Sequence, residues 1–386
     1  MKRKRFVSLF LALIMCFGLS TPSLAVNVNK SEALSDKAVM AYALNFMTEA
    51  QNNHSLKIKD FIPLYLNNEQ ISGYYVTFCD KDVPAGYVLL SLLTEGSPVV
   101  EFSLEGSGPL EIAEASNQLS AVKFTDESLN IVDKEKILYT GPGQLYIPID
   151  SKKYYSVFDN KIREIPLDTA TLNSESSGSI SISGGIIDWA NASINTNSVF
   201  KIKNFGEGTD YWLMTQFSSG AVCVPTAATN ILWYWGKMRG SSKVMSEVSG
   251  YGTDKAKATA IFNTLKKFMG TDLENGTKDS KTYAGYSGFF GSPPDGQWNY
   301  KILSNGTSFN TYKTELNNNC PIQVILHTKD GLLDKGDGHH VMAFGYANST
   351  SGTPYLFVMD GWNNYGRFVK FNYYPYISGY KIWVAS

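Results

Sequence analysis

The feature that most constrains this chain is a loop of small residues that delivers one cysteine to the start of a helix. Residues 216–235 read QFSSGAVCVPTAATNILWYW, with Cys223 at the junction. Pro225 suits the first turn of a helix, and apolar residues from Ala228 to Trp235 recur at helical spacing. Unpaired backbone N–H groups and a nearby cationic His lower a cysteine pKa from about 8.5 to roughly 3.5–7.5. Two interpretations therefore stand for Cys223, an activated thiol and a buried structural cysteine.

The overall composition is that of an ordinary globular protein. The chain has 386 residues, 43% of them hydrophobic, and a formal net charge of −1. This length accommodates about two domains. The charge balance gives no basis for a nucleic-acid partner.

Residues 1–25 have the organisation of a secretory signal peptide. A basic run, KRKR, precedes an apolar core over residues 6–19, and Ser23-Leu24-Ala25 predicts cleavage after Ala25. The apolar core is shorter than the roughly 20 residues that a membrane span needs, which argues against a retained membrane anchor. We therefore expect a secreted, extracellular protein.

Three cysteines remain after removal of that segment: Cys79, Cys223 and Cys320. An odd and small number in an exported chain argues against a disulfide framework and leaves at least one free thiol. A disulfide between two of them stays open at this point.

Composition divides the mature chain into two domains. A first domain over residues 26–171 begins with a predicted helix at 35–51, followed by β-like runs at 73–78, 86–91 and 98–102. Residues 172–185 are rich in Ser and Gly, as is typical of a linker open to proteolysis.

The second domain, residues 186–386, has an α+β pattern in which helices come first and antiparallel strands follow. Residues 270–298 are rich in Gly and Tyr, and we interpret them as a mobile wall of a substrate cleft. The predicted helices cover 223–235, 255–269 and 308–318, and the predicted strands 322–327, 340–346, 355–359, 367–373 and 379–385.

A thiolate nucleophile needs a base that also returns its proton to the leaving group, and imidazole does both near neutral pH. The second domain offers His327, His339 and His340. His327 ends its own strand, whereas His339 and His340 open a strand after a Gly-Asp-Gly loop. The choice between His339 and His340 stays open on spacing alone.

A third group must fix the tautomer of the imidazole. Asp360 ends the strand that follows the histidines, and a hairpin between the two strands brings Asp360 back beside His339. A turn-forming Asp before Gly361 is the alternative. For the oxyanion, the backbone N–H of Cys223 and the side-chain amide of Gln216 are the candidate donors.

These residues resemble the papain-like cysteine peptidases, closest to the secreted streptopain-like and C39-like groups. The resemblance rests on Gln216, on Cys223-Val-Pro-Thr-Ala227, on HHVMAFGY from His339, and on Asp360-Gly-Trp362. It implies a two-subdomain papain-like fold, with a helical half that carries Cys223 and an antiparallel half that carries His339 and Asp360.

The resemblance also implies roles for these residues. Cys223 is the nucleophile, His339 the base, Asp360 the group that orients it, and Trp362 an aromatic shield. The first domain is similar in outline to an inhibitory pro-domain. Three departures from the family pattern are the second histidine, His340, one extra residue between Gln216 and Cys223, and Asp360 in place of the Asn of papain.

The sequence therefore predicts a secreted cysteine endopeptidase made as a zymogen. It would hydrolyse protein or peptide substrates through a thioester on Cys223, with its own pro-domain as intramolecular inhibitor and no cofactor. The alternatives are a cell-wall amidase or transpeptidase with the same Cys-His pair and an exported binding protein without activity. A metal site from Cys320 and the three histidines is also conceivable, although its spacing fits no familiar zinc pattern, so no metal is expected.

Overall fold

The computed structural model describes residues 35–65, 71–92, 94, 96–115, 136–141, 144–149, 153–157, 161–164, 194–206, 211–291, 297–327, 338–362, 365–371, 373 and 376–385. Its helices are α2 (Asp36–Gln51), α3 (Pro109–Ala115), α5 (Cys223–Trp233), α6 (Ser242–Glu247), α7 (Asp254–Met269), α8 (Thr282–Phe290) and α9 (Phe309–Asn317). Short 3₁₀ turns cover Thr196–Ser198, Met214–Gln216 and Asp279–Lys281, and a π-helical turn, Tyr234–Met238, extends α5. The strands are β1 (Lys57–Tyr65), β2 (Ile71–Asp80), β3 (Val83–Ser91), β4 (Val99–Ser103), β5 (Ile137–Gly141), β6 (Gln144–Pro148), β7 (Lys153–Ser156), β8 (Lys161–Glu164), β9 (Phe200–Lys201), β10 (Trp298–Leu303), β11 (Ile322–His327), β12 (Gly338–Asn348), β13 (Pro354–Met359), β14 (Arg367–Lys370) and β15 (Tyr376–Val384).

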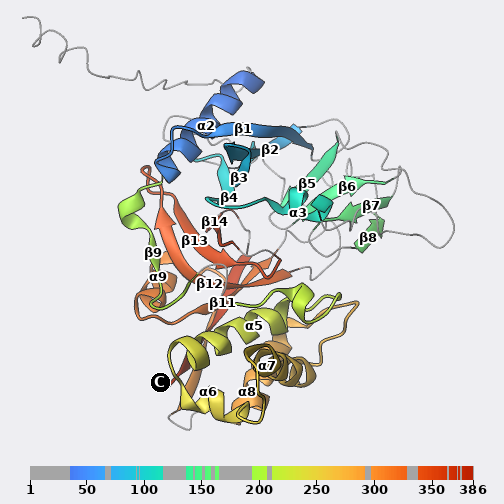
Figure 1. Ribbon diagram of the computed structural model, residues 1–386, viewed down its shortest axis with the longest axis vertical. Helices are drawn as coiled ribbons and strands as arrows, with labels where there is room; N and C mark the ends of the chain where they lie inside the picture. Colours follow the sequence, from blue (N-terminus) through green and yellow to red (C-terminus); the bar gives the residue numbers. More distant parts are fainter. Residues whose placement is uncertain are drawn as a thin grey trace, which may run out of the picture.

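The N-terminal part, residues 35–164, is a twisted sheet with α2 packed against it (Figure 1). α2 begins after Ser35, whose hydroxyl accepts a hydrogen bond from the N–H of Ala38, and ends at Asn52 in the left-handed conformation. Its buried face, which includes Val39 and Phe46, packs in one hydrophobic cluster with β2, β3 and β4. β1 to β4 pair antiparallel, and β1 continues the sheet by a parallel pairing with β5.

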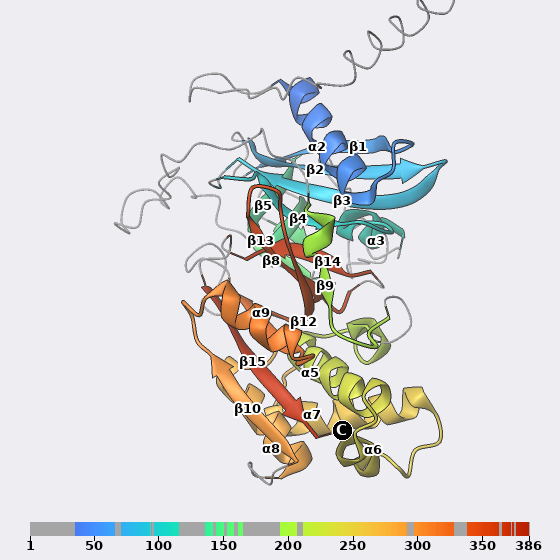
Figure 2. The same ribbon diagram turned by 90° about the vertical axis from the view of Figure 1, so that its left-hand side faces the viewer.

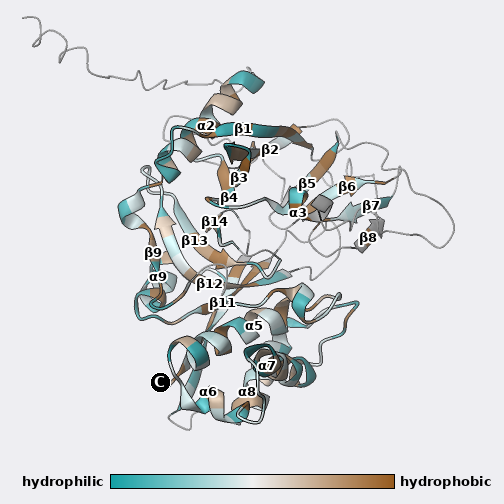
Figure 3. Cartoon of the chain, in the orientation of Figure 1, coloured by the Kyte–Doolittle hydropathy of each residue, from teal (hydrophilic) through white to brown (hydrophobic). Residues whose placement is uncertain are grey.

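The C-terminal part, from residue 194, places helices against an antiparallel sheet. α5 packs against β11 and β12 on one side and against α7 and α8 on the other. Every residue of α5 from Val224 to Trp233 is buried, which is the pattern of a central helix. Figure 2 shows α9, β15 and β10 on the side of the molecule that lies at the left in Figure 1. Figure 3 shows apolar residues concentrated in the strands of the sheet.

The two parts share one sheet. β14 pairs antiparallel with β4, so the strand order runs β10-β15-β11-β12-β13-β14-β4-β3-β2-β1-β5-β6-β7-β8, with β9 beside β12. At this junction Phe368 lies opposite Phe102, and their rings stack at 4.7 Å. Lys370 also crosses the junction, donating to the carbonyl of Ser97 at 2.9 Å. The N-terminal part is thus joined to the C-terminal part by main-chain pairing as well as by side chains.

The structure confirms the predicted α+β class. Cys223 lies on the helical half of the C-terminal part, and His339 and Asp360 lie on its antiparallel half, as predicted. β11 has the predicted bounds, and α5, α7 and α9 lie within two residues of theirs, except that α5 gives way to a π-helical turn at Tyr234. Nine of residues 270–298 form α8, and the interpretation of this section as a mobile wall of a substrate cleft stays a prediction.

The predicted signal peptide, residues 1–25, and the predicted linker, residues 172–185, lie outside the described residues. The structure therefore does not test those predictions. None of the helices in the described part of the chain has the length and apolar character that crossing a membrane requires.

Candidate active site

Cys223 is the first residue of α5, as predicted. Val222 occupies the N-cap position and provides no side-chain acceptor, so the N–H groups of the first turn are not satisfied by a cap. The cysteine is half-buried and packs in a small apolar cluster with Met214, Phe217 and Trp362. Its sulfur therefore lies at the positive end of α5 within an apolar surround.

The net effect of this surround on the thiol is the opposite of the predicted one. Burial raises the pKa of Cys223 above its ordinary value of 9.0. Hydrogen bonds from the backbone N–H groups of His340, Val224 and Cys223 itself act in the other direction, and the carboxylate of Asp279 adds to the rise. Because desolvation outweighs the helix start, the thiol is protonated at neutral pH in this structure.

His339 is fixed by a hydrogen bond and by stacking. Its Nε2 lies 2.9 Å from the main-chain carbonyl oxygen of Asp360. A carbonyl only accepts, so Nε2 carries the proton and Nδ1 keeps its lone pair. The ring stacks on the indole of Trp362 with centroids 3.8 Å apart. Burial, the guanidinium of Arg367 and His340 hold the pKa of His339 well below its ordinary value of 6.5, so the imidazole is neutral.

Asp360 lies beside His339, but it contacts the imidazole through its backbone and not through its carboxylate. The carboxylate is buried, accepts from the N–H of Trp362 at 2.7 Å, and forms an ion pair with Arg367. Gly361, at φ +83°, turns the chain between these contacts, in a region that disfavours any residue with a Cβ. The expectation that the Asp360 side chain orients the imidazole is therefore replaced by a main-chain contact.

His340 points to the opposite face of β12, as neighbours in a strand do. Its Nδ1 lies 3.0 Å from Nε2 of Gln323, and its Nε2 lies 2.9 Å from a carboxylate oxygen of Asp279. The amide nitrogen donates, so Nδ1 accepts and Nε2–H donates to Asp279. Both ring nitrogens are thus engaged and the ring is buried, which favours His339 over His340 as the base.

Gln323 joins this network to the helix of the candidate nucleophile. Its Nε2 also donates to the carbonyl of Val224 at 3.2 Å, and its Oε1 accepts from the hydroxyl of Tyr286 at 2.7 Å. Strands β11 and β12 are therefore tied to the first turn of α5 by buried polar contacts. Sequence analysis missed Gln323, although it is the single polar residue in the apolar run from Ile322 to Leu326.

Gln216 ends the 3₁₀ turn that precedes the cysteine loop. Its side-chain Oε1 accepts from the N–H of Leu213 at 2.7 Å, and its main-chain carbonyl accepts from Lys255. Among the contacts of the described residues, none joins the Gln216 amide to Cys223. Leu213 binds the oxygen end of the amide, so this contact does not engage the nitrogen end.

The remaining cysteines are not part of this site. Cys79 and Cys320 are free, so no two of the three cysteines are bridged. Cys320 is buried and its thiol donates to the carbonyl of Ile382, and burial raises its pKa to about 12. Among the described residues, no three His, Cys, Asp or Glu side chains are grouped as metal ligands.

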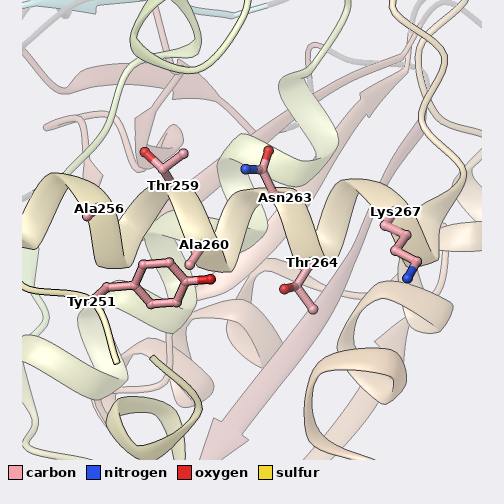
Figure 4. Close-up of a pocket in the computed structure, with 7 residues that line it drawn as sticks. All are labelled: Tyr251, Ala256, Thr259, Ala260, Asn263, Thr264 and Lys267. Carbon is pink, nitrogen blue, oxygen red and sulfur yellow. The ribbon is translucent and has the colours of Figure 1, made fainter. Parts of the chain in front are cut away.

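A hollow of about 420 Å³ lies elsewhere, on the outer face of α7. Figure 4 shows its lining, which comes from one face of α7 and from Tyr251. None of Gln216, Cys223, His339 and Asp360 lines it. It is a shallow surface feature that is separate from the candidate site.

Comparisons with known proteins show which family the C-terminal part is similar to. Residues 209–382 match the model of the Peptidase_C39 like family, and the match spans all four predicted site residues. This confirms the predicted resemblance to papain-like cysteine peptidases and supports a cysteine peptidase. Among solved structures, the chain is similar to a fragment of prointerpain A from Prevotella intermedia, at 13% identity and a TM-score of 0.37, over 83% of this chain and 97% of that chain. Curated proteins show no significant match.

Proposed function

We propose that this chain is the precursor of a secreted cysteine endopeptidase with Cys223 as nucleophile and His339 as base. The observation that carries the proposal is the hydrogen bond from His339 Nε2 to the carbonyl of Asp360. It leaves Nδ1 unprotonated, as a general base requires, and the ring stacks on Trp362. The strand that carries His339 and His340 packs against α5, and Gln323 joins the ring of His340 to the carbonyl of Val224 in the first turn of α5.

In the proposed reaction, Nδ1 of His339 takes the thiol proton and the Cys223 sulfur attacks the substrate carbonyl carbon. The negative charge on the carbonyl oxygen is stabilised by the N–H of Cys223 and by Nε2 of Gln216. The imidazolium then protonates the leaving amine as the C–N bond breaks. A water molecule, deprotonated by the same imidazole, hydrolyses the thioester and returns the thiol to Cys223.

The protonation states in the full chain fit a latent precursor. The thiol is protonated and the imidazole is neutral, whereas the most reactive form of such a pair is the thiolate with the imidazolium. We propose that the N-terminal part acts as an inhibitory pro-domain. We also propose that residues 1–25 direct export and that the chain is cut between the two parts.

Self-processing tests this proposal directly. The full chain and its Cys223→Ala variant are incubated, and the products are followed by mass spectrometry. We expect the parent chain to convert to a shorter form and the variant to persist uncut. Cys79→Ser is the matched control, since it removes a free thiol on β2 and should convert like the parent. Equal conversion of Cys223→Ala would exclude self-processing.

The substrate class requires a second experiment with the processed protein. Incubation with an unfolded protein should release peptides, and incubation with purified cell wall should release nothing. Fragments from the wall alone would show an amidase or transpeptidase. Fragments from neither would favour a binding protein. N-terminal sequencing of the secreted chain tests export, for which we expect a start at Val26 or at the processed site.

A further inference from the structure

We propose that Glu101, in the N-terminal part, belongs to the candidate active site. It binds Arg367 and, through Arg367 and Asp360, it positions the imidazole of His339. This inference rests on the proposed function, because it makes Arg367 and Glu101 positioning residues for the proposed base. It also makes the N-terminal part a structural component of the site and not only a cover over it.

The first observation is a buried guanidinium between two carboxylates. Arg367 binds Glu101 through Nη1 at 2.6 Å and pairs with Asp360 through Nη2. The three side chains are 3%, 2% and 1% exposed, so water does not replace any of these contacts. Glu101 also accepts a hydrogen bond from the hydroxyl of Tyr87 at 2.5 Å. Glu101 and Tyr87 belong to β4 and β3, on the far side of the junction.

The second observation concerns Trp362, which packs on both sides of the junction. It contacts the core cluster of the N-terminal part, which includes Tyr87 and Val100, and it also contacts the cluster around Cys223. The same indole stacks on His339 and lies under the guanidinium of Arg367 at 5.6 Å. The N-terminal part is therefore linked to His339 by apolar packing through Trp362 as well as by the ion pair of Glu101 with Arg367.

The charge balance explains how this network holds the segment from Asp360 to Trp362. One guanidinium pairs with two buried carboxylates, and a buried carboxylate that loses its cation is strongly destabilised. Both carboxylates therefore stay paired with Arg367, and the Asp360 side chain is fixed. The carbonyl that accepts the hydrogen bond from His339 belongs to the same residue, so its position is fixed too.

Removal of Glu101 changes this balance without touching the C-terminal part. Arg367 then serves Asp360 alone and is free to move toward it. The turn at Gly361 and the indole of Trp362 shift with Asp360, so the stacking of the imidazole on Trp362 changes while its hydrogen bond to the Asp360 carbonyl is kept. Separation of the N-terminal part has the same effect, because Glu101 leaves with it.

Nuclear magnetic resonance of the full chain, with ¹³C-labelled histidine, tests the inference in the Cys223→Ala background. With the label at Cε1, four histidines give four ring signals, and His339→Asn identifies the one of interest. Because the ring stacks on Trp362, its protons resonate upfield of a free imidazole. We expect Glu101→Gln and Arg367→Gln to move this signal downfield. We expect the double variant to move it no further than Arg367→Gln alone, since both act through one guanidinium.

Lys370→Met is the matched control. Lys370 lies on the same strand as Arg367 and also crosses the junction, donating to Thr94 and Ser97 at 2.9 Å, but it has no described contact with Asp360 or Trp362. We expect its His339 signal to be unchanged. An unmoved signal in folded Glu101→Gln would overturn the inference, as would an equal shift in Lys370→Met. If Arg367→Gln fails to fold, the isosteric Glu101→Gln decides alone. The signal needs no catalysis, so a failure of the proposed function leaves this result interpretable.

Discussion

The imidazole of His339 donates to the main-chain carbonyl of Asp360 at 2.9 Å, while the carboxylate of the same residue pairs with Arg367. One residue thus has two separable contacts. Its backbone fixes the tautomer of the proposed base, and its side chain fixes the residue itself in the core.

Asp360→Asn separates these two contacts. The carbonyl remains, so we expect kcat to fall by only about tenfold, far less than the roughly 10⁴-fold that loss of tautomer control costs in a serine triad. The buried ion pair with Arg367 is lost, and we expect the free energy of unfolding to fall by about 3 kcal/mol. Activity assays and urea unfolding measure the two effects. Asp279→Asn, at the rim of the site, is the control for loss of a carboxylate. Abolished activity at unchanged stability would show that the carboxylate itself orients His339.

The two adjacent histidines should respond differently to substitution. His339→Ala removes the proposed base, so we expect activity to fall by about 10²–10⁴-fold at nearly unchanged stability. His340→Ala leaves Gln323 and Asp279 without their partner, so we expect unfolding to become easier by about 2 kcal/mol while activity stays within tenfold. Parallel measurements of kcat and of urea unfolding compare them. The reverse pattern would assign the base to His340.

Stability should fall at both ends of the pH range. The pKa of His339 lies well below 6.5 in the folded chain, so below about pH 6.5 the unfolded chain binds a proton that the folded chain does not. Acidification therefore destabilises the fold from that pH downward. The pKa of Cys223 is raised above 9.0, so above about pH 9 the unfolded chain loses a proton that the folded chain keeps, and stability falls again.

Urea unfolding between about pH 5 and about pH 10 measures this dependence. In His339→Asn the free energy of unfolding should fall less steeply at acid pH. In Cys223→Ala it should fall less steeply at alkaline pH, but only in part, because the buried thiol of Cys320 contributes there as well. If the free energy of unfolding falls as steeply at acid pH in His339→Asn as in the parent, other groups cause the fall.

Gln216→Ala tests the proposed oxyanion contact. Loss of one preorganised donor lowers kcat by about 10²–10³-fold, with little change in KM. The substitution also removes the acceptor for the N–H of Leu213, which should cost about 1 kcal/mol of stability. Ser218→Ala, in the same loop, provides the comparison. Equal kcat values for Gln216→Ala and the parent would remove Gln216 from the mechanism.

Local patterns in the sequence were sufficient to predict much of this arrangement. The helix that starts at Cys223 follows from Pro225 and the spacing of its apolar residues, and the approach of Asp360 to His339 follows from the β12–β13 hairpin. Both depend on contacts between segments that are close in the chain.

Features that depend on distant segments were not predictable in this way. Arg367 and Glu101 lie 266 positions apart, and no local periodicity indicates that β14 pairs with β4. The direction of the Cys223 pKa shift was missed for a related reason. A helix start is visible in the sequence, whereas the apolar packing of Phe217 and Trp362 that desolvates the sulfur is not.

The pairing of β14 with β4 also determines what a cut between the two parts would uncover. Once β4 is gone, β14 becomes the outermost strand, and the main-chain N–H and C=O groups of Phe368 and Val369 lose their partners. An open edge that carries apolar side chains is a template for another extended chain. The mature protein would therefore have to occupy or shield this edge, and conditions that release the N-terminal part without covering it should promote aggregation.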